Sequence, residues 1–117
     1  MAEAQTLNLA MEMNNDYSFL INNYSDSSKT PLDITDYTFY FTIKTDKLDE
    51  NSEAIINKTI TSHIDPTNGI TRISISSSEI ENLYGVYSYD IIRVSDTETK
   101  TTLFKGNFTI TQATRKA

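Results

Sequence analysis

The chain has 117 residues, a length typical of one domain with a single two-layer core. It contains no cysteine, which excludes disulfides, a thiol nucleophile and cysteine-bound zinc. The 16 acidic and 10 basic side chains give a net charge of −6, which disfavours sequence-independent binding to nucleic acid. No segment has the roughly 20 apolar residues of a membrane span, and residues 1–5 do not resemble a secretory signal.

The N-terminal part contains two segments in which apolar and polar residues alternate, as they do in half-buried strands. These are Leu7 to Met13 and Tyr17 to Ile21, with the turn-forming residues 14–16 between them. We therefore predict that the two segments pair as a hairpin. Residues 22–31 are almost all polar and are expected to form a surface loop.

Residues 37–44 have the pattern of a central strand, because aromatic and β-branched residues dominate them. The odd-numbered positions are predicted to face the core, and the even-numbered ones, including Tyr40, to face outward. The charged residues 45–53 are predicted to form a solvated connection. In the shorter strand Ile55 to Ile60, Ile56 and Ile60 are expected to point inward and Lys58 to lie near an edge.

The C-terminal half begins with a predicted turn at residues 65–69, where proline and Asn-Gly favour turn conformations. A strand at 71–75 is followed by a Ser-x-x-Glu capping box at residues 76–79, which predicts one or two helical turns over 79–84. Gly85 is expected to end them.

The last two predicted strands carry the clearest alternation. Tyr87, Tyr89 and Ile91 share one face of the first strand, whereas Ser88 and Asp90 share the other. A polar hairpin loop at 95–100 leads to a final strand at 103–110. In that strand Gly106 is expected to mark a bulge or a close approach of another backbone segment.

These elements predict an all-β fold: an immunoglobulin-like two-sheet antiparallel β-sandwich of about seven strands with one short helical turn. A single domain is expected over residues 1–117, with short arms at 1–6 and 113–117. One core is predicted from Leu9, Phe19, Phe39, Phe41, Ile73, Ile75, Tyr87, Tyr89, Ile91, Phe108 and Ile110.

The segment Leu83-x-Gly85-x-Tyr87 resembles the tyrosine corner of immunoglobulin-like domains. In that motif a tyrosine near the start of a strand bonds backbone across the corner. We expect Tyr87 to be buried with its hydroxyl bonded to backbone. The alternative is that Tyr87 is simply a core aromatic residue.

The sequence offers few groups for chemistry. His63, the only histidine, lacks an adjacent nucleophile or second ligand and is expected to face solvent at a strand end. The acidic loop 46–53 has carboxylates that calcium prefers but lacks the spacing of an EF-hand. Tyr40 and Tyr24 either stack on a sugar or a partner surface or, as the sequence favours, pack under a loop. We therefore predict no catalytic, cofactor-binding or metal-binding residues, no cofactor and no enzyme activity.

Three stretches of the sequence resemble small virion proteins of tailed bacteriophages. They are Leu32 to Lys44, Ile64 to Gly69 and Leu83 to Ile91, and the ending Gly106 to Ile110 is similar to the family's final strand. The N-terminal domain of phage baseplate upper proteins is the named relative that the chain resembles. The matched positions are strand and turn residues, so the resemblance implies a fold and a role but no ligand site.

The resemblance implies a non-enzymatic virion structural protein, an adaptor or decoration module in tail, baseplate or capsid. Its expected partners are other virion proteins, in many copies or as a homo-oligomer, with no nucleic acid, membrane or small-molecule substrate. It would be made in the host cytoplasm and reside in the virion. Two alternatives remain open: a secreted or surface-displayed carbohydrate-binding or adhesion β-sandwich, and a small enzyme or metal-dependent regulator.

Overall fold

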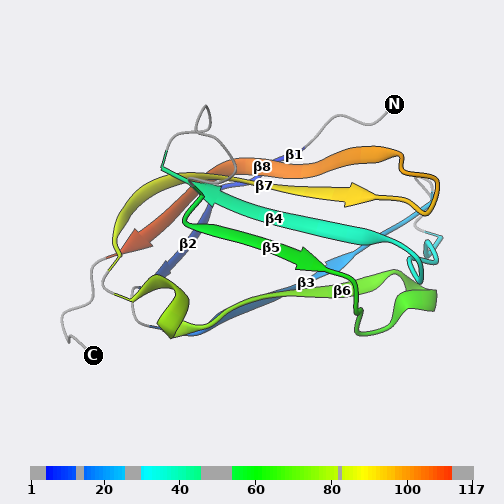
Figure 1. The fold of residues 1–117 in the computed structure, drawn as a ribbon, viewed down its shortest axis with the longest axis horizontal. Helices are drawn as coiled ribbons and strands as arrows, with labels where there is room; N and C mark the ends of the chain where they lie inside the picture. Colours follow the sequence, from blue (N-terminus) through cyan, green and yellow to red (C-terminus); the bar gives the residue numbers. More distant parts are fainter. Residues whose placement is uncertain (1–4, 13–14, 26–29, 46–53, 82, 112–117) are drawn as a thin grey trace.

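The computed structural model describes residues 5–12, 15–25, 30–45, 54–81 and 83–111. It is an all-β sandwich of two packed sheets (Figure 1). The larger sheet contains β1 (Gln5–Thr6), β2 (Leu9–Glu12), β4 (Thr38–Lys44), β5 (Ile56–Ile60), β7 (Gly85–Val94) and β8 (Lys100–Thr111). The smaller sheet contains β3 (Tyr17–Asn22) and β6 (Ile70–Ile75). Two short 3-10 helices, η2 (Pro66–Asn68) and η3 (Ser77–Ile80), flank β6.

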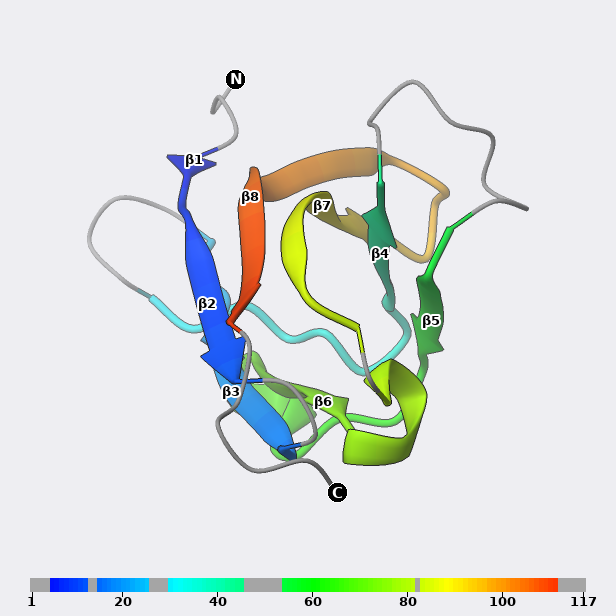
Figure 2. The same ribbon diagram turned by 90° about the vertical axis from the view of Figure 1, so that its left-hand side faces the viewer.

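The larger sheet has the strand order β1-β8-β7-β4-β5, and β2 also pairs with β8. Because β1 and β2 follow one another along β8, the eight segments act as seven strands, in agreement with the predicted sandwich. The order β8-β7-β4-β5 matches the G-F-C-C′ order of variable-type immunoglobulin sheets. Figure 2 shows these four strands curving around one side of the molecule, with β3 and β6 on the other.

The predicted hairpin between the first two strands is wrong. β2 runs parallel to β8 in the larger sheet, whereas β3 pairs antiparallel with β6 in the smaller one. The chain therefore passes from one sheet to the other between β2 and β3. The physical reason is that β8 is 12 residues long and its outer edge has backbone N–H and C=O groups that need partners. β1 and β2 supply these partners by pairing along that edge. This pairing also makes the sheet mixed and not purely antiparallel.

Of the expected arm at 1–6, residues 5–6 form β1, while 1–4 and 113–117 lie outside the described residues.

The core confirms most of the predicted strand faces. Of the predicted set, all but Leu9, Phe19 and Tyr87 are buried, and these three are partly buried against the same cluster. Phe41 lies at its centre, where its ring meets Phe19 and Phe108 nearly edge to face at centroid distances of 6.2 and 6.3 Å. Such arrangements are favoured by the aromatic quadrupole. The alternation in the sequence thus reports the inward faces correctly.

A buried polar side chain, Asn23, joins four segments at one end of the sandwich. Its backbone N–H and its side-chain Nδ2 both donate to the carbonyl oxygen of Gly69, each at 2.8 Å. Its Oδ1 accepts from Nη1 of Arg93 at 3.1 Å, and its backbone oxygen accepts from the N–H of Leu32 at 3.0 Å. Burial lowers the pKa of Arg93, whose guanidinium lies 5.8 Å from the Tyr37 ring centroid. Asn23 is only 2% exposed, and its backbone and side-chain polar groups have the hydrogen-bond partners that buried polar groups require.

The expected solvent-facing position of His63 is also wrong. The ring is partly buried, and its two nitrogens lie 2.9 Å from the Thr71 hydroxyl and 2.9 Å from the Tyr37 carbonyl oxygen. It also packs edge-on against Phe39, with ring centroids 5.4 Å apart. Because Thr71 is fully buried, its hydroxyl requires a partner, and the imidazole supplies it. His63 is therefore a packing residue.

The capping box forms, but it begins a shorter helix than expected. The N–H and the hydroxyl of Ser76 both donate to the Glu79 carboxylate, at 2.9 and 3.1 Å, and the 3-10 turn η3 covers Ser77–Ile80. Lys58, which faces inward from the edge strand β5, donates to the same carboxylate oxygen at 2.8 Å. Burial acts to raise the pKa of Glu79, but these hydrogen bonds outweigh it and the pKa is lowered.

The tyrosine corner is present in modified form. The hydroxyl of Tyr87 donates to the carbonyl oxygen of Tyr84 at 3.0 Å, as predicted. The side chain is partly exposed, however, so the expected burial of Tyr87 is wrong. Tyr87 is the third residue of β7, which begins at one end of the sandwich close to η3 (Figure 1).

Gly106 is a point of close backbone approach, one of the two outcomes predicted for it. A Cβ atom there would lie 2.7 Å from the carbonyl oxygen of Leu7 and 2.9 Å from Oδ1 of Asn8. Asn8 uses that Oδ1 to accept from the N–H of Asn107 at 3.1 Å, and the hydroxyl of Tyr89 donates to the same Leu7 carbonyl. The bulge lies elsewhere, where the pairing of β7 and β8 shifts between Ile91 and Ile92.

Candidate functional site

The outer face of the larger sheet contains a hollow of about 550 Å³, which we call the outer-face hollow. It spans three neighbouring strands and the hairpin between β7 and β8. Its lining residues are Tyr40, Thr42, Lys44, Asn57, Asp90, Ile92, Val94, Glu98 and Lys100.

Strand alternation and register bring these side chains together. Tyr40 and Thr42 face outward from β4, and in register they lie opposite Ile92 and Asp90 of β7. On the other side of β4, Asn57 of β5 lies opposite Thr42. Because neighbouring strands are about 4.8 Å apart, such side chains form one continuous row across the sheet. A floor built on strands is a rigid base for a binding site.

The hairpin from β7 to β8 forms one rim of the hollow. The N–H of Ser95 donates to the carbonyl oxygen of Thr99, and the N–H of Glu98 donates to that of Ser95, both at 2.9 Å. Glu98 has a φ of 64°, which is an uncommon conformation for a residue other than glycine. The predicted polar loop at 95–100 is therefore a tight turn, with Lys100 already the first residue of β8.

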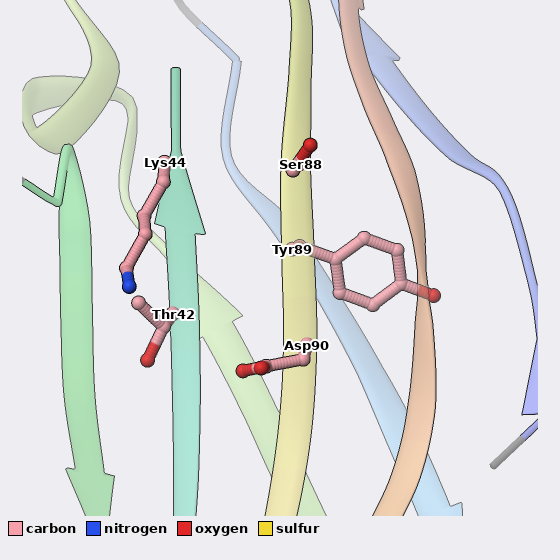
Figure 3. A pocket seen from close by; sticks show the side chains of 5 residues that line it. All are labelled: Thr42, Lys44, Ser88, Tyr89 and Asp90. Atoms are coloured by element: carbon pink, nitrogen blue, oxygen red, sulfur yellow. The ribbon is translucent and has the colours of Figure 1, made fainter. Parts of the chain in front are cut away.

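Asp90 is the group in the hollow with the most unusual environment. Its carboxylate points from β7 toward β4 and Thr42 (Figure 3). The side chain is half-buried, and burial raises its pKa, although the charge of Lys44 acts in the opposite direction. Within the described residues, the Asp90 carboxylate forms no hydrogen bond or salt bridge. Burial removes water from this carboxylate, and the charge of Lys44 offsets that cost only in part, because the net effect is a raised pKa.

A second surface lies at the opposite edge of the same sheet, and we call it the β2 edge. Through the pairing register, Ala10 of β2 neighbours Thr109 of β8, which neighbours Val86 of β7. Ala10 is exposed, and Val86, Tyr84 and Leu7 are 63%, 56% and 46% exposed. Large apolar side chains that are exposed close together on a protein surface often mark a site of interaction with another molecule.

The sequence identified part of these two surfaces. Tyr40 lies in the outer-face hollow, whereas Tyr24 is exposed elsewhere, beside its bridge partner Pro31. The sequence placed Asp90 on the outward face but did not connect it with Ile92 and Val94. Ile92 and Val94 follow Asp90 at every second residue, so extending the alternation to the end of the strand would have placed all three side chains on the same outward face.

The acidic loop at 46–53, whose carboxylates are of the kind that calcium prefers but whose spacing is not that of an EF-hand, lies outside the described residues. Among the residues that the structure describes, no group of three or more histidine or acidic side chains is arranged to hold a metal ion. The described part of the chain also contains no helix long and apolar enough to cross a membrane.

Neither a family model nor a curated protein sequence matches the chain. Among solved structures, it is similar to a family 123 glycoside hydrolase from Clostridium perfringens, with a TM-score of 0.43 and 14% sequence identity. That match covers 92% of this chain but only 23% of the hydrolase chain. A likeness at this level supports no conclusion about activity.

Proposed function

We propose that the chain is a non-enzymatic structural protein of a tailed-phage virion, an adaptor or decoration module that acts through protein–protein contacts. Its partners would be other proteins of the tail, baseplate or capsid, or further copies of itself, and its location the virion. The resemblance of the strand and turn segments suggests this class. The observation that carries the mode of action is the β2 edge.

The β2 edge is suited to receive another chain. β2 pairs with β8 on one side, and among the described strands none pairs with its other side. Its four residues, Leu-Ala-Met-Glu, contain one charge and no proline, so little in their sequence opposes the addition of a further strand.

The side chains next to this edge favour association as well. Val86 is the second residue of β7 and Tyr84 directly precedes that strand, and Ala10 lies in the same outward row as Val86. Covering these exposed side chains would add apolar burial to the backbone hydrogen bonds of strand pairing. By contrast, most of the remaining outward positions on β8 carry threonine, lysine or asparagine.

A charge placed at this edge should prevent assembly without unfolding the domain. Val86→Lys puts an ammonium group on a side chain that is already 63% exposed, so the isolated domain should keep its stability. Leu20→Lys is the matched control, because Leu20 is 50% exposed on the smaller sheet. We expect quantitative mass spectrometry of purified particles to find the first variant depleted and the second at wild-type occupancy.

Deleting residues 1–6 gives a second test, because it removes β1, which continues the β2 edge along β8, and leaves β2 and the core in place. The truncated protein should fold but should not enter particles. Wild-type occupancy of both this truncation and Val86→Lys would refute the β2 edge as the docking surface and point to the loops at 22–31 or 46–53. The virion assignment itself would fail if the gene has no portal, capsid or tail-tube gene near it.

A further inference from the structure

We propose that the outer-face hollow is a binding site for a neutral saccharide, with Tyr40 as the stacking platform and Asp90 as the main hydrogen-bond acceptor. This site is separate from the β2 edge, so it does not depend on the assembly role. Its volume of about 550 Å³ lies within the range of small-molecule sites.

The apolar part of the hollow matches one face of a sugar ring. Tyr40 is 38% exposed and lies opposite Ile92 in the strand register, with Val94 two residues further along β7. The C–H face of a pyranose packs well against an aromatic ring and aliphatic groups. In the strand register these apolar groups lie between Asp90 with Thr42 on one side and Lys100 of the hairpin on the other, so the hollow has an apolar centre with polar groups around it.

The polar part of the hollow matches hydroxyl groups. Thr42 and Asn57 offer both donors and acceptors, and Asp90 offers acceptors. A sugar hydroxyl is itself both donor and acceptor, so it can satisfy groups of either kind. Two cations, Lys44 and Lys100, and two anions, Asp90 and Glu98, line the hollow, and this balance gives no preference for a charged ligand.

Asp90 is the feature that indicates a ligand in preference to an ordinary sheet surface. The Asp90 carboxylate is half-buried, it has no hydrogen bond to the described residues, and the charge of Lys44 compensates for its burial only in part. Groups with such environments occur more often at functional sites than elsewhere. A pair of vicinal hydroxyls would donate to its two oxygens and replace the lost hydration.

The test is a titration of the isotope-labelled chain, followed by amide nitrogen–proton NMR spectra. The probes are D-galactose, D-glucose, N-acetyl-D-glucosamine and lactose, with D-galacturonic acid and D-galactosamine as charged comparisons. We expect shifts confined to β4, β5, β7 and the 95–100 hairpin. A monosaccharide should bind with a dissociation constant on the order of 1–10 mM, from the usual affinity per ligand atom.

Two substitutions test the assigned roles. Tyr40→Ala should weaken binding by about tenfold and Tyr40→Phe should restore it, because stacking needs the ring and not the hydroxyl. The matched control is Tyr84→Ala, which removes a tyrosine that is 56% exposed outside the hollow. Asp90→Asn should weaken binding roughly three- to tenfold through loss of a charged acceptor, while Asp36→Asn, at an exposed position, should not.

Three results would overturn the proposal. The first is the absence of shifts in the hollow with every neutral sugar at several times the expected dissociation constant. The second is tighter binding of the charged sugar than of galactose, since that indicates an ion-binding surface. The third is equal loss of binding in Tyr40→Ala and Tyr84→Ala. Well-dispersed spectra of each variant establish that it is folded, so a loss of binding cannot come from unfolding.

Discussion

Replacing Asn23 by alanine is expected to lower the free energy of unfolding by about 2–3 kcal/mol. The substitution removes the hydrogen bond from Nδ2 to the Gly69 carbonyl, at 2.8 Å, and the one that Oδ1 accepts from Arg93, at 3.1 Å. A neutral hydrogen bond contributes about 0.5–1.5 kcal/mol and one to a charged group about 1.5–3 kcal/mol.

We expect the loss of stability to lie in the lower part of the sum of these two hydrogen-bond contributions, for two reasons. The Gly69 carbonyl keeps its bond from the backbone N–H of Asn23, so it is not left without a partner. Arg93 is only half-buried and rests against the Tyr37 ring, so part of its lost bond is replaced by water.

The assay is urea unfolding with linear extrapolation, and the slope should be unchanged because the folded core is the same. Asn22→Ala is the matched control, since the preceding residue is exposed and should change stability by less than about 0.5 kcal/mol. A double-mutant cycle with Arg93→Met should give a coupling free energy of about 1–3 kcal/mol. If Asn23→Ala is no less stable than Asn22→Ala, the buried network does not hold this end of the sandwich together.

Three further changes test the structure independently. Gly106→Ala should destabilise the domain by about 1–3 kcal/mol, because the new Cβ would lie 2.7 Å from the Leu7 carbonyl oxygen; wild-type urea stability would mean that the first strand does not approach β8 there. Tyr87→Phe should lose about 0.5–1 kcal/mol, the lower part of the range for one hydrogen bond, because its bond to Tyr84 is solvent-accessible; an unchanged midpoint would exclude the corner. Burial raises the folded-state pKa of Asp90 above its ordinary value of 3.8, so its stabilising contribution is present at low pH and is lost as the pH rises through that folded-state pKa. Asp90→Asn should therefore be more stable than the wild type at pH 7, with a difference that shrinks as the pH falls toward 3.8; a pH-independent difference would contradict this explanation.

The alternation of apolar and polar residues was enough to predict which side of most strands faces the core. Phe39 and Phe41, Tyr89 and Ile91, and Phe108 and Ile110 are buried as their alternation predicts, because side-chain direction follows from the local backbone period of two. The turn at residues 65–69 and the capping box at 76–79 could also be predicted, because both depend on residues that are close together in the sequence. Gly69 ends η2 with a φ of 74°, and the Ser-x-x-Glu box forms before η3.

Tertiary structure alone decided which strands are partners and which polar groups are buried. The alternation of β2 is the same whether it pairs with β3 or with β8, since pairing depends on edges that are distant in the sequence. His63 and Asn23 are polar residues in polar segments, and only the approach of Thr71, Tyr37, Gly69 and Arg93 makes them internal.

The outer-face hollow arises in the same way. Each of its side chains has an outward position that the sequence predicts, but Tyr40 and Ile92 are separated by a long stretch of chain and meet only through the β4–β7 register. Alternation is a property of neighbouring residues, whereas a site needs distances between strands. Those distances are set by the packing of the whole sandwich, which no local pattern contains.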